Sequence, residues 1–174
     1  MRISVHSDLP FAIFRYDPED EWQMREEAQR LGTRLRGKGK QVVSISLGEL
    51  MWEAIEASEG IDAIVELEKE HGFEMAQDQV TTYLSDPNWR PLPDALAEKL
   101  SACDPERHVA FLMRAAALAP SIYPISRLLD EMHGRTSVPA VLFYPGSIDG
   151  PTGLQFMGLP GRATLGNYRV KIYG

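Results

Sequence analysis

Several apolar stretches of this sequence end in side chains that could bind a ligand or a partner. They are Arg15, Tyr16, Asp17, Arg114 and Tyr144. Open α/β sheets bind ligands at the carboxyl ends of their parallel strands, so these residues form a predicted rim for a ligand or a partner. Arg114 there could meet a ligand, and the carboxylates near Asp17 could hold Mg²⁺. Such a rim would suit a small enzyme or a nucleotide or magnesium sensor.

Structural roles account for the same residues and are favoured here. Asp17 precedes Pro18 and further acids, which is the usual composition at the start of a helix, so we interpret it as an N-cap. Arg114 directly follows an apolar run, and a charge in that position needs a partner. We expect Arg114 to pair with Asp17, and the ligand-binding rim is the alternative.

The motifs for catalysis are incomplete in this chain. Residues 32–38 match the glycine and lysine spacing of a phosphate-binding loop, but Gly39 stands where a Ser or Thr must bind Mg²⁺. The segment also ends a predicted helix, so we interpret it as a basic helix terminus with a glycine stop. No zinc-protease or serine-hydrolase motif is present, and Cys103 is the only cysteine. We therefore predict no catalytic residue, no metal ligand and no cofactor.

Two tryptophans and one basic run are further candidate contacts with a partner. Trp52 lies off the apolar face of its predicted helix, and Trp89 lies in a proline-rich turn. We expect both to pack against neighbouring helices, with anchoring of a partner as the alternative. The basic run has no interleaved aromatic residues, so we interpret it as a solvated helix end rather than a nucleic-acid site. Its members are Arg30, Arg34, Arg36, Lys38 and Lys40.

Alternating strands and helices must position these residues. Apolar runs predict strands at residues 11–14, 42–45, 109–113, 139–144, 154–157 and 168–172. Periodicity and capping residues predict helices at 18–37, 47–58, 61–70, 78–84, 93–102 and 125–133. Ser46 and Glu49 are expected to form a capping box at the start of the second of these helices. We therefore predict one α/β domain over residues 1–174, with an open, mainly parallel sheet flanked by helices. Residues 60–107 form a helical, insertion-like region, and the Gly- and Pro-rich residues 134–174 form a β-rich hairpin or edge region.

The chain of 174 residues is acidic, with a net charge of −7 at pH 7. Residues 1–107 contain 22 acids and 12 bases, whereas residues 108–174 contain 3 acids and 6 bases. The net negative charge argues against a dedicated DNA-coating protein, so contact with DNA is expected to be indirect at most. No signal peptide and no run near the ~18 apolar residues of a membrane span is present. We expect a cytoplasmic protein that does not contact membranes.

A set of short segments, taken in order, carries a resemblance to one known family. The segments are residues 10–18, 44–47, 138–146, 154–158 and 167–172. Together they resemble the BrxB family, small proteins encoded in BREX bacteriophage-exclusion clusters. The resemblance implies a place in a multiprotein antiviral complex with a PglZ-type protein and a large BrxC-type ATPase. It implies no catalytic residues.

The acidic first part and the basic last part suit docking between partners of opposite potential, where charge sets association rate and specificity. Together with the resemblance, this predicts a non-catalytic adaptor of the BREX system. The alternative is a small enzyme or a nucleotide or magnesium sensor that uses the rim around Asp17, Arg114 and Tyr144.

Overall fold

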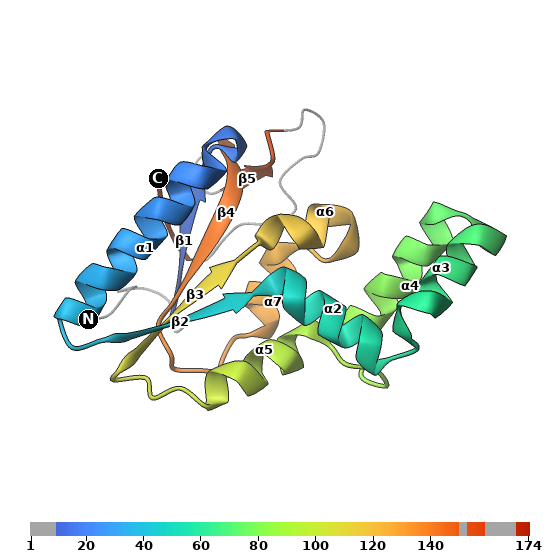
Figure 1. Ribbon diagram of the computed structural model, residues 1–174, viewed down its shortest axis with the longest axis horizontal. Coiled ribbons are helices and arrows are strands. Elements are labelled where there is room, and N and C mark those ends of the chain that lie inside the picture. Colours follow the sequence, from blue (N-terminus) through green and yellow to red (C-terminus); the bar gives the residue numbers. More distant parts are fainter. Residues whose placement is uncertain (1–9, 150–152, 159–169) are drawn as a thin grey trace.

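A mostly parallel sheet of six strands lies at the centre of the computed structural model, which describes residues 10–149, 153–158 and 170–174. The strands are β1 (Phe11–Tyr16), β2 (Gln41–Ser46), β3 (His108–Met113), β4 (Ala140–Asp149), β5 (Gly153–Phe156) and β6 (Lys171–Tyr173). Their order is β2-β3-β4-β1-β6, and β5 pairs with β4 in the one antiparallel hairpin of the described strands. The predicted α/β class, with a hairpin near the C-terminus, is confirmed (Figure 1).

Helices and short 3₁₀ turns connect these strands. They are η1 (Pro18–Asp20), α1 (Glu21–Gly37), α2 (Leu47–Ala57), α3 (Gly60–His71), α4 (Phe73–Ser85), α5 (Leu92–Ser101), η2 (Ala115–Leu118), α6 (Ala119–Ile122) and α7 (Ile125–Glu131). The predicted N-cap roles of Asp17 and Ser46 are confirmed. The Asp17 side chain accepts a hydrogen bond from the Glu19 amide at the start of η1, and the Ser46 side chain accepts one from the Glu49 amide at the start of α2.

Some boundaries differ from the predicted ones. α4 begins at Phe73 rather than at Asp78, because Gly72 takes a positive φ of 87° and turns the chain within a single residue. η2 and α6 were not expected, since elements of so few residues leave no periodic pattern. Residues 168 and 169 of the last predicted strand lie outside the described residues, as do parts of the predicted glycine-rich region.

The two faces of the sheet carry separate cores. α1 covers one face, where Met24 and Ala28 pack with Phe111 and Phe143. The larger core lies on the other face and includes residues of α2, α5 and α7. The chain moves across the sheet in one direction from β1 to β2 and returns in the other from β2 through β3 to β4. Right-handed crossovers then place the connecting helices on opposite faces.

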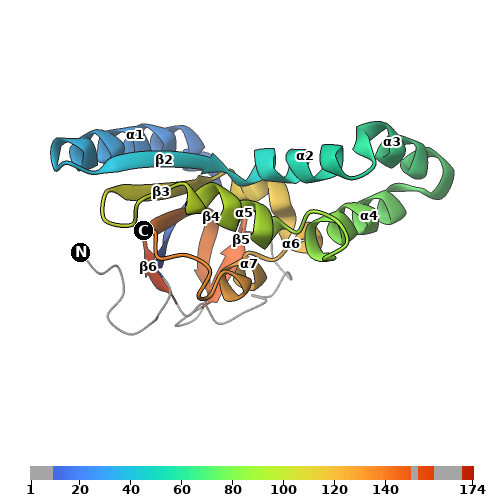
Figure 2. The ribbon, with the colours of Figure 1, turned by 90° about the horizontal axis from the view of Figure 1, so that it is seen from below.

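Three consecutive helices lead the chain away from the sheet. α2 packs against η2 and α5, whereas α3 and α4 pack mainly on each other and extend beyond the rest of the fold (Figures 1 and 2). Ile64, Val80 and Tyr83 connect this extension to the larger core. We call α2, α3 and α4 (residues 47–85) the helical arm.

Candidate functional site

The predicted rim residues lie at the carboxyl ends of β1, β3 and β4, but they do not meet in one place. β4 lies between β1 and β3, so Asp17 and Arg114 are two strands apart, roughly 10 Å across the sheet. Asp17 caps η1, with 3.1 Å between its Oδ1 and the Glu19 amide nitrogen. Among the described residues Arg114 forms no ion pair. The expected pairing of Arg114 with Asp17 is therefore wrong.

Alternation along β1 divides the rim between the two faces of the sheet. Tyr16 belongs to the core beneath α1, whereas Arg15 lies opposite Tyr144 in the β1–β4 register and shares the other face with it. Tyr144 is buried in the larger core, with its ring edge-on to Phe156 at 6.0 Å. The Arg15 Nε is buried without a hydrogen-bond partner in the described part of the chain. Sequence spacing alone could not show this division, because it depends on the register of each strand.

A hydrogen-bonded chain joins Tyr16 to the first turns of α1. The Tyr16 hydroxyl donates to Glu21 Oε2 at 2.5 Å, and Arg25 Nε donates to Glu21 Oε1 at 2.8 Å. Burial, followed by the hydrogen bond to Glu21, raises the pKa of Tyr16 above its usual value of 10. Both carboxylate oxygens of Glu21 thus accept hydrogen bonds. The Glu21 carboxylate therefore anchors α1 to the sheet rather than acting as a free base.

A cavity of about 380 Å³ opens beside Glu21 and Arg25, at the carboxyl ends of β2 and β3. Its lining residues are Glu21, Arg25, Ser44, Ser46, Glu49, Met113 and Arg114. The volume lies in the range of small-molecule sites. Arg114 has a left-handed backbone, with φ 58° and ψ 39°, and is one of the residues that line this cavity. The cavity therefore offers an arginine that no described carboxylate pairs with, together with two hydroxyls and the Glu49 carboxylate.

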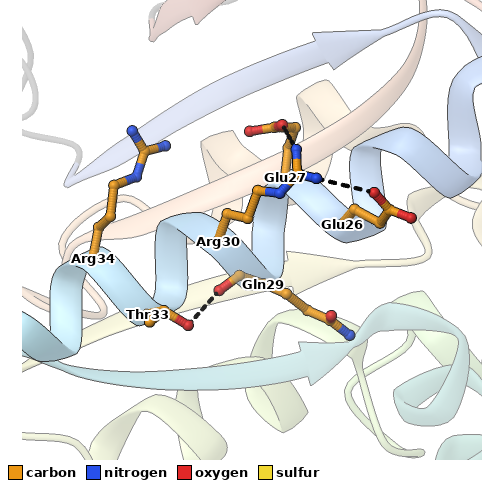
Figure 3. A pocket seen from close by; sticks show the side chains of 6 residues that line it. All are labelled: Glu26, Glu27, Gln29, Arg30, Thr33 and Arg34. Atoms are coloured by element: carbon orange, nitrogen blue, oxygen red, sulfur yellow. Dashed lines mark hydrogen bonds and ion pairs between the residues drawn. The ribbon is translucent and has the colours of Figure 1, made fainter.

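A broader hollow of about 790 Å³ lies along the exposed face of α1 (Figure 3). Arg30 bonds Glu27 at 2.5 Å and Glu26 at 3.3 Å, and the Thr33 hydroxyl donates to the Gln29 carbonyl. These bonds stay within a single helix, so the hollow is a solvated helix surface rather than a convergent site. Because Arg30 is paired with glutamates, the basic run is also weaker as a nucleic-acid surface than its sequence indicates.

The two tryptophans singled out in the sequence differ in their surroundings. Trp89 packs edge-on against the Tyr83 ring with 5.0 Å between centroids and is 38% exposed. Trp52 on α2 is 50% exposed and remains a candidate partner contact. Trp22 was not singled out, although it lies off the apolar face of α1; it is 76% exposed, with the Arg25 guanidinium over its ring at 5.1 Å.

The helical arm concentrates the negative charge of the chain. Residues 47–85 contain ten acids and one lysine, a net charge of −9, whereas the other residues together carry +2. The arm also exposes large apolar side chains, with Phe73 65% and Met75 51% accessible. Sequence counting showed an acidic first part; the structure shows that the excess lies in one projecting element.

Within the described ranges, no group of three or more His, Cys, Asp or Glu side chains is arranged to hold a metal ion. Likewise, none of the helices in the described part is long and apolar enough to cross a membrane.

The fold and the cavity define an open α/β protein with strand-end polar residues and a projecting acidic arm. A family model described as BREX protein BrxB matches residues 43–171, which run from β2 to the start of β6. The chain therefore belongs to the BrxB family and is a component of a BREX phage-defence system. Comparisons with curated proteins and with solved structures gave no match.

Proposed function

We propose that this chain is a non-catalytic adaptor of a BREX defence complex. Its partners are the PglZ-type protein and the large BrxC-type ATPase that the family resemblance implies. Membership of the BrxB family supports the place in the BREX system. The adaptor role is a separate step and rests on the surface of the protein.

The observation that carries the adaptor role is the helical arm. It projects from the sheet, carries a net charge of −9, and leaves Phe73 and Met75 more than half exposed. Repulsion between so many like charges is unfavourable within the free protein. Covering the exposed apolar side chains with a partner lowers the free energy. An element with both properties fits a docking surface better than a catalytic one.

The charge distribution also predicts how association should depend on salt. A negative arm steers a basic partner toward it over distances of about one Debye length, near 8 Å at physiological ionic strength. Salt screens this attraction and lowers the association rate, while the apolar contacts persist. The complex should therefore form fastest at low salt and weaken, without disappearing, as salt rises.

Co-purification tests the adaptor role directly. The intact chain, untagged, is expressed with the tagged PglZ-type or BrxC-type protein of its own BREX cluster and captured at 50 mM and 500 mM salt. We expect specific capture with at least one partner at 50 mM and reduced capture at 500 mM. An unrelated acidic protein of similar size serves as the control. Absence of capture at 50 mM with both baits would refute the proposal.

A second candidate function is supported by the cavity at β2 and β3. Arg114 lines this cavity and has no ion-pair partner among the described residues, so it could contact a phosphate of a nucleotide. This is the sensor or enzyme alternative, now confined to the face of the sheet that α1 covers. Arg15 and Tyr144 lie on the other face and would not contribute to it.

Thermal denaturation discriminates between the two functions. Nucleoside mono-, di- and triphosphates are added with and without Mg²⁺. A nucleotide at 100 times its Kd stabilises the folded state by about 2.7 kcal/mol. For a chain of this length that corresponds to a rise in Tm of roughly 5–10 °C. A rise that Arg114→Gln abolishes, and that the exposed-arginine control Arg34→Gln retains, would support the sensor. No rise with any nucleotide would exclude it.

A further inference from the structure

Phe73 lies at the tip of the helical arm, where α3 turns into α4. It begins the apolar face of α4, since Ala76 and Val80 follow it at i+3 and i+7. Ala76 and Val80 are buried, yet Phe73 is 65% exposed. The apolar face of α4 therefore continues beyond the residues that cover it.

Carboxylates occupy the turns next to Phe73. Glu68 and Glu70 lie in the last turn of α3, and Glu74 lies in the first turn of α4. All three are exposed, and the only contact of this kind that they make within the described residues joins Glu70 to His71 at 3.7 Å, which is an ion pair only when the imidazole is protonated. The tip thus presents a large apolar ring with carboxylates that few cations of the same chain neutralise.

This combination selects one kind of partner. A nucleic acid is repelled by the like charge of the arm. A second copy of the chain is a poor match, because its residues outside the arm carry a net charge of only +2. A protein surface with an apolar pocket bordered by Lys and Arg side chains complements both properties of the tip.

We propose that the tip of the helical arm docks into such a basic-bordered apolar pocket on a partner protein, with Phe73 as the buried anchor. The inference rests on the proposed adaptor function and specifies the surface that performs it. Aromatic side chains that become fully desolvated at the centre of an interface often contribute most to the affinity. The surrounding carboxylates set the association rate and the choice of partner.

The experiment measures Kd of the intact chain for the PglZ-type and BrxC-type proteins by biolayer interferometry at 50 mM and 500 mM salt. Phe73→Ala removes the anchor, and Trp22→Ala is its control, since it removes a still more exposed aromatic ring from α1. Glu68→Lys with Glu70→Lys reverses the charge at the tip; cations are favourable in the last turn of a helix, so folding is retained. Glu26→Lys with Glu27→Lys makes the same charge change on α1.

We expect Phe73→Ala to weaken binding at least tenfold at both salt concentrations. The charge reversal on α3 should weaken binding at least tenfold at 50 mM and much less at 500 mM, and both α1 controls should stay within threefold of wild type. Circular dichroism confirms that each variant is folded.

The outcomes separate the two proposals. Wild-type chain that binds neither protein overturns the adaptor function itself. Wild-type binding that both tip variants retain overturns the docking inference and leaves the adaptor function standing. Light scattering on the chain alone provides a further check: a dimer that Phe73→Ala dissociates would mean that a second copy covers the tip, which also overturns the inference.

Discussion

Replacing Tyr83 by phenylalanine removes a single hydroxyl that ties the helical arm together. Tyr83 on α4 is fully buried, and its hydroxyl donates to Glu59 Oε2, at the junction of α2 and α3, at 2.5 Å. A hydrogen bond to a charged acceptor contributes about 1.5–3 kcal/mol, and the exposure of Glu59 lowers this to about 1–2 kcal/mol. Urea unfolding at pH 8 should show this loss of free energy in Tyr83→Phe. Thermal unfolding at the same pH should show a fall in Tm of roughly 3–6 °C.

The same substitution has a predicted pH dependence. Burial, then the bond to Glu59, raises the pKa of Tyr83 from 10 to about 12. The unfolded chain releases this proton near pH 10 while the folded chain keeps it, so the stabilisation is complete below pH 10 and is lost as pH rises toward 12. About half is lost at pH 11, which corresponds to roughly 1 kcal/mol. Tyr83→Phe has no such proton. The difference in free energy of unfolding between wild type and Tyr83→Phe should therefore shrink by roughly 1 kcal/mol between pH 8 and pH 11.

The control for this experiment is Tyr173→Phe. Tyr173 is 44% exposed, so removal of its hydroxyl should change the free energy of unfolding by less than about 0.5 kcal/mol. Two results would refute the reasoning. One is a Tyr83→Phe variant as stable as wild type at pH 8. The other is a deficit that stays the same at pH 11.

Three further substitutions test the fold by urea unfolding. Ser46→Ala removes the cap of α2 and should cost about 1 kcal/mol; a loss below a few tenths would contradict the capping role. Gly146→Ala places a Cβ 2.1 Å from the Gln155 carbonyl oxygen across the β4–β5 hairpin, and should cost more than about 3 kcal/mol or prevent folding; a well-folded variant of normal stability would contradict that pairing. Leu96→Ala opens a cavity in the larger core and should cost about 2–5 kcal/mol, against under 0.5 kcal/mol for the exposed Val65→Ala.

Local signals in the sequence accounted for most of the elements. The strands that became β1, β3 and β4 are continuous apolar runs, because both faces of a parallel sheet are covered. The starts of η1 and α2 followed from Asp17 and Ser46, since a cap requires only contacts within three residues. The start of α4 was missed because Gly72 ends one helix and begins the next without any loop.

The candidate site was predicted only in part. The strand-end residues were identified from sequence, and the structure places Arg114 at a cavity with Ser44 and Ser46. Arg25 was missed, since nothing in the sequence marks it as different from other helical arginines. It joins the site because the first turns of α1 lie over the carboxyl end of the sheet and bring it to Glu21 and this cavity.

Residue types and short spacings were enough to predict the α/β class, the caps, the resemblance to the BrxB family and the total charge. The tertiary structure alone decided the strand order, and with it the separation of Asp17 from Arg114 and the division of the rim between two faces. It also decided that the negative charge lies in a projecting arm whose tip is the turn from α3 to α4, the turn at which α4 begins with Phe73. These properties depend on contacts between residues far apart in the chain, which local patterns do not encode.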